Sequence, residues 1–281
     1  MKKIKAYFLT KSVGLYINFL SYVAPSKAFQ LAYVFFSNPR SGRLQSASLP
    51  EILQKSHRET HQLNEHHIQT YHWQGNETVI LLMHGWESNS SRWEKLLPQL
   101  LNTGSTIIAL DAPAHGLTNG KEFNVPLYAS FAEMVIQKYQ PQHIIGHSMG
   151  GITAIYHQHQ YGNPLLQKMV LLGAPSDFSI ILHNYLKLLS LNNKIKNAFY
   201  DYTKERFQID IDDFSGQAFL KSSPTQGMII HDTDDTVVLF EEAKKLAATW
   251  KSATLISTNG LGHSLHDEEV NQRIVAFLLE A

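Results

Sequence analysis

The chain has 281 residues, 43% of them hydrophobic and 17% charged, which is enough to build the core of one large globular domain. Basic and acidic residues number 24 each, and the resulting zero net charge argues against a nucleic-acid binder that neutralises phosphates. The chain contains no cysteine, which excludes disulfides, thiolate metal sites and a cysteine nucleophile.

The first segment of the chain differs from the rest in charge. Residues 1–50 contain seven basic residues and no acidic one, whereas the remainder contains 17 basic and 24 acidic residues. Helical spacing between residues 6 and 23 places Lys11, Gly14, Asn18 and Ser21 on one face, with Leu15 and Tyr22 intruding there. The other face carries apolar residues, namely Leu9, Val13, Tyr16, Ile17, Leu20 and Val23.

Two interpretations of this N-terminal segment remain open. It can be an amphipathic helix on an anionic membrane surface, or a helix packed on the main domain with solvated basic residues. A transmembrane span is not expected, because no uninterrupted apolar run approaches the required length, and Lys11 interrupts the apolar stretch that a signal peptide needs. We expect a cytoplasmic protein. On the first of these interpretations, residues 1–50 would make a peripheral contact with a membrane.

Short apolar runs alternate with helical patterns from about residue 68 onward. The predicted strands are Val79–Met83, Thr106–Leu110, His143–Ile145, Met169–Leu172, Met228–His231 and Thr254–Ser257, with an earlier strand at Ile68–Trp73. The predicted helices are Ser91–Leu101, Pro126–Tyr139, Met149–Tyr161, Phe240–Trp250 and Asp267–Leu279. This alternation predicts an α/β fold, a doubly wound and mostly parallel sheet over residues 51–281. Residues 176–225 lack a clear strand and predict a small helical cap inserted over the strand ends.

One motif carries nucleophile chemistry. Gly146-His147-Ser148-Met149-Gly150 matches G-x-S-x-G at the junction of a predicted strand and helix. A sharp turn there lifts the serine hydroxyl above the sheet edge, and the glycines remove colliding side chains. A serine hydroxyl is a weak nucleophile, so it needs a base that is itself oriented by a carboxylate.

Candidates for the acid and the base follow two later strands. Asp232, Asp234 and Asp235 come after Met228–His231, and His263 comes after Thr254–Ser257. Both loops lie at the carboxyl ends of predicted parallel strands, where open α/β sheets bind ligands. His266 competes with His263 for the role of base.

These motifs, in this order, resemble the α/β-hydrolase family over about residues 68–281. The family's strand-His-Gly-x-x-Asp pattern matches His231 to Asp235, so the resemblance implies Asp235 as the acid, and Gly-x-Gly-His implies His263 as the base. Asp232 stands where the family has glycine and Leu239 where it often has proline, which keeps Asp234 as an alternative acid. The resemblance also implies that the backbone N–H groups of Trp86, in His84-Gly85-Trp86, and of Met149 form an oxyanion hole.

Asp111-Ala112-Pro113-Ala114-His115-Gly116 resembles a further turn of the family, with Ala114 in place of a glycine, and we expect it to be structural.

The family resemblance implies a serine hydrolase that cleaves a carboxylic ester through an acyl-enzyme, in the manner of a carboxylesterase or lipase. Thioester, lactone and carbon–carbon cleavage remain alternatives, as does a ligand-binding protein without turnover. We expect a small-molecule substrate with an apolar group, because residues 180–191 are rich in leucine and isoleucine. We expect no cofactor and no metal, although His57, His61, His66, His67 and His72 cluster in sequence.

Overall fold

The structure is a computed structural model that describes the backbone of residues 2–280 and the side chains of residues 7–280. The chain divides into two compact units. Unit 1 comprises Met1–Asn38 and Asp177–Ser215, and unit 2 comprises Pro39–Ser176 and Gly216–Ala281. The expected boundaries differ from these, because residues 39–50 and 216–225 belong to unit 2. The side chains of Lys2, Lys3 and Lys5, part of the expected basic segment, lie outside the described ones.

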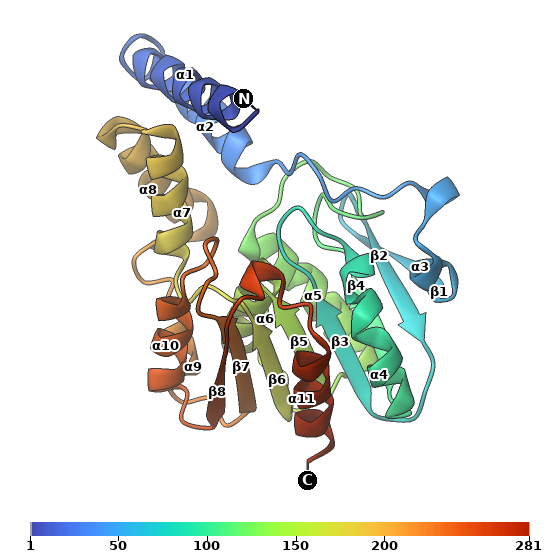
Figure 1. Cartoon of the computed structure of the whole chain (residues 1–281). Helices are drawn as coiled ribbons and strands as arrows, with labels where there is room; N and C mark the ends of the chain where they lie inside the picture. Colours follow the sequence, from blue (N-terminus) through green and yellow to red (C-terminus); the bar gives the residue numbers. More distant parts are fainter. Residues whose placement is uncertain (1, 281) are drawn as a thin grey trace. The chain divides into compact units, whose positions relative to one another are not determined.

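Unit 2 is built on an eight-stranded sheet with the order β1-β2-β4-β3-β5-β6-β7-β8 (Figure 1). Neighbouring strands from β3 to β8 run parallel, whereas β2 pairs antiparallel with both β1 and β4. The sheet therefore confirms the predicted doubly wound and mostly parallel α/β fold. The strands are β1 (His57–Leu63), β2 (His66–Trp73), β3 (Val79–Met83), β4 (Thr106–Leu110), β5 (His143–His147), β6 (Lys168–Leu172), β7 (Gln226–Asp232) and β8 (Ala253–Thr258).

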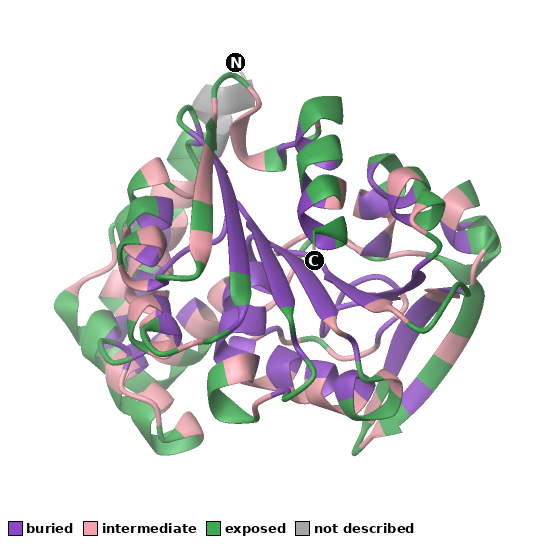
Figure 2. Cartoon of the chain, turned by 90° about the horizontal axis from the view of Figure 1, so that it is seen from below, coloured by how far each residue is buried: buried purple, intermediate pink, exposed green. Residues whose placement is uncertain are grey.

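Burial explains which strands could be predicted. Every residue of β4, β5 and β6 is buried, so these strands are short apolar runs rather than alternating patterns. Figure 2 shows these central strands as buried ribbons between two helical layers. Strand β1 was not predicted, because it lies at one edge of the sheet and its sequence His-Arg-Glu-Thr-His-Gln-Leu is mostly polar and exposed.

Helices cover both faces of the sheet. Helices α3 (Glu51–Gln54), α4 (Leu97–Asn102) and α11 (Glu268–Leu279) share an apolar core with one face of the sheet. Helices α5 (Val125–Tyr139) and α6 (Met149–Gln160) lie on the opposite face, and α9 (Gly216–Leu220) and α10 (Phe240–Thr249) continue that layer (Figure 1). Three short 3₁₀ helices, η1 (Ser46–Ser48), η2 (Ser90–Lys95) and η3 (Gly262–Ser264), lie in the connections.

Unit 1 consists of helices α1 (Lys2–Val23), α2 (Pro25–Ser37), α7 (Phe178–Leu189) and α8 (Asn193–Phe207). These helices share their own apolar core, in which Ile17 of α1 packs with Leu182, Leu186 and Leu189 of α7 and with Phe199 of α8. Three of the leucines that suggested an apolar substrate, Leu182, Leu186 and Leu189, thus pack within this unit, whereas Leu188 is exposed. No helix within residues 2–280 is both long enough and apolar enough to cross a bilayer.

Candidate active site

Ser148 occupies the turn between strand β5 and helix α6. It has φ 52° and ψ −119°, and it is the N-cap residue of α6, whose first residue is Met149. A positive φ is unfavourable for a residue with a side chain, so the surrounding structure must hold Ser148 in this conformation. Its backbone N–H donates to the carbonyl of Leu172 at the end of β6, 2.8 Å away. The predicted strand-to-helix turn is therefore present at Ser148.

The glycines around Ser148 are required by close backbone approaches. A Cβ atom on Gly146 would lie 2.6 Å from Cα of Gly151, and one on Gly150 would lie 2.1 Å from the carbonyl oxygen of Met83. A Cβ atom on Gly85 would lie 2.8 Å from Cβ of Ser148. Larger residues at these positions would force the turn apart from β3 and α6, which is why the motif needs glycine there.

Three residues from distant parts of the chain form one hydrogen-bonded array. Nε2 of His263 lies 3.0 Å from Oγ of Ser148, and Nδ1 of His263 lies 2.7 Å from Oδ2 of Asp235. Asp235 follows β7, and His263 lies in the 3₁₀ helix η3 after β8. The structure therefore brings together Ser148, His263 and Asp235, the three residues that were expected from the sequence.

Asp235 is held as an ionised carboxylate. It is 3% exposed, and its Oδ1 atom accepts hydrogen bonds from the backbone N–H groups of Val237 and Val238, at 2.8 and 3.0 Å. Burial by itself would raise the pKa of Asp235, but the hydrogen bonds from His231, His263 and these two N–H groups outweigh it and hold the pKa well below its ordinary range. A negative charge is thus fixed against Nδ1 of His263.

The alternative acid and base lie elsewhere. Asp234 is exposed, and its Oδ2 atom accepts a hydrogen bond from the side-chain amide of Asn259. His266 is exposed as well. Partial desolvation of its ring and the nearby positive charges of Arg92 and Lys95 lower its pKa. Of the two carboxylates considered, only that of Asp235 has a hydrogen bond to His263 among those of the described residues.

Two histidines contact the array in ways that the sequence did not indicate. Nε2 of His147 donates to the backbone carbonyl of His263 at 2.9 Å, and the two ring centroids are 4.9 Å apart. Nε2 of His231 lies 3.4 Å from Oδ2 of Asp235 and donates to the carbonyl of Val238 at 2.8 Å. His147 belongs to the G-x-S-x-G motif and His231 to the pattern that ends at Asp235. No sequence pattern, however, predicts a hydrogen bond from such a side chain to a backbone carbonyl in another loop. The two histidines fix the loops that carry His263 and Asp235.

The loop after β3 passes beside Ser148. Gly85 approaches the side chain of Ser148, and Trp86 follows it directly. Met149 opens helix α6, where the first backbone N–H groups have no partner within the helix. His84 is fully buried, with Nδ1 2.8 Å from the carbonyl of Gly85 and Nε2 accepting from the N–H of Ala112. Burial lowers the pKa of His84 to about 4, so it is a neutral brace for this loop.

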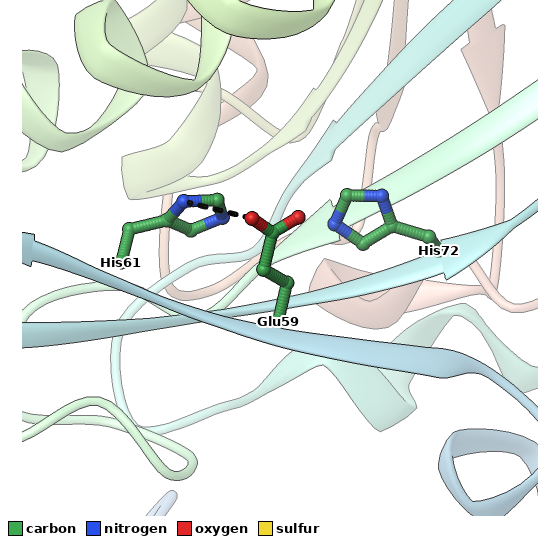
Figure 3. Close-up of side chains that lie close together, drawn as sticks. All are labelled: Glu59, His61 and His72. Carbon is green, nitrogen blue, oxygen red and sulfur yellow. Dashed lines mark ion pairs between the residues drawn. The ribbon is translucent and has the colours of Figure 1, made fainter.

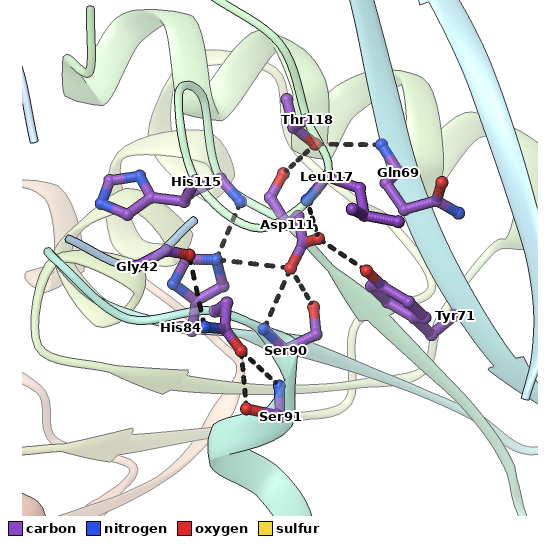
Figure 4. A network of polar contacts seen from close by, with 12 residues as sticks. Gly42, Gln69, Tyr71, His84, Ser90, Ser91, Asp111, His115, Leu117 and Thr118 are labelled. Atoms are coloured by element: carbon purple, nitrogen blue, oxygen red, sulfur yellow. Dashed lines mark hydrogen bonds and ion pairs between the residues drawn. The ribbon is translucent and has the colours of Figure 1, made fainter. Parts of the chain in front are cut away.

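The turn after β4 is a buried polar network around Asp111 (Figure 4). Oδ1 of Asp111 accepts from the N–H and hydroxyl of Ser90, and Oδ2 accepts from the N–H of Leu117 and the hydroxyl of Tyr71. A Cβ atom on Gly116 would lie 1.9 Å from Oδ2 of Asp111. Tyr71 of β2, Ser90 of η2 and Leu117 of the turn all donate to Asp111. The network therefore holds these three segments together, which is a structural role.

A group of possible metal ligands lies at the edge of the sheet. Glu59, His61 and His72 offer ligand atoms that all lie within 4.8 Å of one another and point toward one another across β1 and β2 (Figure 3). The carboxylate of Glu59 contacts the ammonium of Lys138 and accepts from the hydroxyl of Tyr139. Burial raises the pKa of Glu59, but these hydrogen bonds lower it to about 2. Lys138 thus already places a cation against this carboxylate, and the expected lack of a metal stays a prediction.

Comparisons with known proteins agree with this architecture. The family model described as "alpha/beta hydrolase fold" matches residues 78–208, a range that contains Ser148 and ends before Asp235 and His263. A serine hydrolase-like protein of Danio rerio is 28% identical over 149 residues, covering 47% of this chain and 45% of that protein. A pimeloyl-[acyl-carrier protein] methyl ester esterase of Klebsiella pneumoniae is 32% identical over 76 residues, covering 27% of this chain and 28% of that protein. The chain thus matches less than half the length of either relative.

Among solved structures, a bromoperoxidase from Bacillus anthracis has a TM-score of 0.62 at 18% identity and covers 80% of this chain and 100% of its own. At that identity the likeness concerns the fold alone. The parallel sheet, the strand-turn-helix at Ser148 and the matched family model lead to one assignment. The chain has the α/β-hydrolase fold.

Proposed function

We propose that the protein is a serine hydrolase that cleaves a carboxylic ester through an acyl-enzyme. The observation that carries this proposal is the array in which Oγ of Ser148, the imidazole of His263 and the carboxylate of Asp235 are joined at 3.0 and 2.7 Å. Such an array supplies a nucleophile, a base and a fixed charge that orients the base. A serine in the turn, rather than an aspartate, directs the reaction toward acyl transfer.

In the first step, Oγ of Ser148 attacks the substrate carbonyl carbon while its proton passes to Nε2 of His263. Nδ1–H of His263 donates to Oδ2 of Asp235 throughout, so the ring holds the tautomer that accepts at Nε2. His263 then gives the proton to the leaving alkoxide, and the ester Ser148–acyl remains. His263 then deprotonates a water molecule, which attacks that ester; as the Ser148–acyl bond breaks, His263 returns the proton to Oγ of Ser148 and the acid is released.

The tetrahedral intermediates carry an oxyanion, which the backbone N–H groups of Trp86 and Met149 would receive. The approach of Gly85 to Ser148, and the position of Met149 at the start of α6, support these two donors. Donors arranged in advance can each lower the barrier by roughly 3 to 4 kcal/mol. The indole of Trp86 packs edge-on against Phe123, with centroids 5.5 Å apart, and offers an apolar wall for an acyl or alcohol group.

Other reactions use the same residues. Thioesters, lactones and certain carbon–carbon bonds are cleaved by serine in this fold, and fold and array determine the reaction style rather than the substrate. A ligand-binding protein without turnover is the alternative of a different class. The continuous hydrogen bonding from Ser148 to Asp235 favours catalysis over binding alone, because a pocket used only for binding has no need of an oriented base.

A panel of p-nitrophenyl esters of graded chain length tests the proposal, together with mass spectrometry after fluorophosphonate treatment. We expect ester hydrolysis, a fluorophosphonate adduct on Ser148, and loss of both in Ser148→Ala. Ser222→Ala, which alters an exposed serine of the same unit, is the matched control and should behave like the parent protein. A folded protein that neither hydrolyses esters or thioesters nor forms the adduct would overturn the proposal in favour of a binding protein.

A further inference from the structure

Helix α1 is covered on one side by the other helices of unit 1, and this covered side combines apolar with polar residues. Ile17 lies in the core of unit 1, with Val13 and Leu20 packed against that core. Polar and small residues of α1, namely Lys11, Gly14, Asn18 and Ser21, face the same helices. In most surface helices the apolar stripe faces the core and the polar residues face water, whereas in α1 the predicted apolar stripe is split, because Leu9, Tyr16 and Val23 are exposed.

Lys11 binds the end of helix α7. Its ammonium donates to the carbonyl of Leu188 at 2.9 Å, to the carbonyl of Lys187 at 3.4 Å and to the hydroxyl of Ser190 at 2.8 Å. The last carbonyls of a helix lack partners within the helix and carry partial negative charge, so a lysine is favourable there. The charge of Lys11 is therefore used inside unit 1.

The rest of this polar face is bonded to the turn between α7 and α8. Asn18 donates to the carbonyl of Ser190 at 2.8 Å and accepts from the N–H of Asn192 at 2.9 Å. Ser21 accepts from the side-chain amide of Asn192 at 2.9 Å. A Cβ atom on Gly14 would lie 1.7 Å from the carbonyl oxygen of Leu189. These contacts fix the rotation of α1 about its own axis.

The opposite side of α1 is apolar and exposed to solvent. We call it the outer face, and it consists of Phe8, Leu9, Leu15, Tyr16, Phe19, Tyr22 and Val23, with Ser12 among them. Each of the seven apolar and aromatic residues is between 55% and 72% exposed. At 100° per residue they cover an arc of roughly 140° along nearly the whole helix. A contiguous apolar surface of this kind marks an interaction site.

Charge distinguishes among the surfaces that this face could contact. The part of the N-terminal segment that belongs to unit 1, residues 1–38, contains five basic residues and no acidic one, although the whole chain is neutral. Lys194 of α8 stands beside the outer face, with its ammonium 4.1 Å from the centroid of the Tyr22 ring. An apolar stripe rich in Phe and Tyr, with the ammonium of Lys194 beside it, matches the boundary between acyl chains and anionic headgroups.

We propose that the outer face of α1 docks on an anionic membrane surface, with the helix lying in the plane of the interface. Because the polar face is held by α7 and α8, only one side of α1 is free for lipid. The tyrosines place rings among the acyl chains and hydroxyls among the headgroups, which suits an interface better than a dry contact between proteins. This inference concerns unit 1 and does not depend on the proposed chemistry at Ser148.

Flotation with lipid vesicles tests the proposal on the full chain. The vesicles contain phosphatidylcholine alone or phosphatidylcholine with about one third phosphatidylglycerol, so that the lipid charge is the variable. The variant Leu15→Gln/Phe19→Gln removes two apolar side chains of the outer face without disfavouring the helix. The variant Leu165→Gln/Leu279→Gln makes the same change at two exposed leucines of unit 2 and is the matched control. Ser148→Ala separates membrane binding from hydrolysis.

We expect the parent protein, the control and Ser148→Ala to float with the anionic vesicles, less so with phosphatidylcholine alone and less at high salt. Leu15→Gln/Phe19→Gln should bind at least about tenfold more weakly. Equal flotation of that variant and the parent would overturn the proposal. So would a parent protein that does not float but forms a dimer that the same variant dissociates, because the outer face would then contact a second copy. Circular dichroism and thermal melting establish that each variant is folded.

Discussion

Replacement of Asp235 by asparagine tests the proposed array most directly. Oδ1 of Asp235 accepts from the N–H groups of Val237 and Val238 at 2.8 and 3.0 Å, so the carbonyl oxygen of an asparagine must take that place. The amide NH₂ is then directed at Nδ1 of His263. Two donors cannot face each other, so Nδ1 loses its hydrogen, the hydrogen moves to Nε2, and His263 can no longer accept the proton of Ser148.

The expected loss can be sized from this change of tautomer. An oriented base that becomes unable to accept the proton costs about 1,000- to 10,000-fold in kcat. At 1.36 kcal/mol for each factor of ten, this corresponds to about 4 to 5.5 kcal/mol of barrier. The substrate does not contact Asp235 in the proposed mechanism, so KM should change little.

The assay is steady-state hydrolysis of the best p-nitrophenyl ester for the parent, Asp235→Asn and Asp234→Asn. Asp234 is exposed and is bonded to Asn259, so its asparagine variant should keep at least about half of the parent rate. Thermal melts of all three proteins check that the native state is populated. An Asp235→Asn protein that is folded and keeps more than about a tenth of the parent kcat would refute the assigned role of Asp235, and a large loss in Asp234→Asn would transfer that role to its neighbour.

Three further predictions concern stability and are measured by denaturant unfolding. Because the pKa of Glu59 is lowered to about 2, its pairing with Lys138 stabilises the folded state above about pH 4.5, and this contribution is lost as the pH falls through 2. Glu59→Gln should therefore cost about 1 kcal/mol at pH 7, a figure reduced for the partial exposure of the pair, and little at pH 2; equal losses at both pH values would contradict this. Gly14→Ala should destabilise unit 1 by about 1 to 3 kcal/mol, since its Cβ would meet the carbonyl of Leu189, and an unchanged midpoint would show that α1 is not held there. Ala114 has φ 63°, so Ala114→Gly should raise the free energy of unfolding by about 0.5 to 1 kcal/mol, and a marked loss would mean that its buried methyl group outweighs the backbone strain.

The parallel strands and the turn at Ser148 could be predicted because their signals are local. A strand covered on both faces must be a continuous apolar run, so β3 to β7 were recognisable one by one. The G-x-S-x-G pattern reports a close backbone approach that only glycine allows. Strand β1 escaped prediction, because an edge strand keeps one side in water and Glu59 and its neighbours therefore remain polar.

The choice among equivalent residue types required the folded chain. Asp232 ends β7, Asp234 and Asp235 follow it, and two histidines follow β8, and the sequence ranked these residues only through resemblance to a family. Their separation in space depends on loop conformation, which places Asp235 inward and Asp234 in solvent. The contacts of His147 and His231 with these loops follow from the same long-range packing.

By itself the sequence determined the fold class, the glycine-flanked turn at Ser148 and the amphipathic character of the first helix. Tertiary structure alone decided which carboxylate meets His263 and which residues of α1 are covered. Periodicity records that two faces differ, whereas the burial of one of them depends on what the rest of the chain presents. In this protein the end of α7 offers carbonyl groups that need donors, and Lys11 and Asn18 turn inward to supply them.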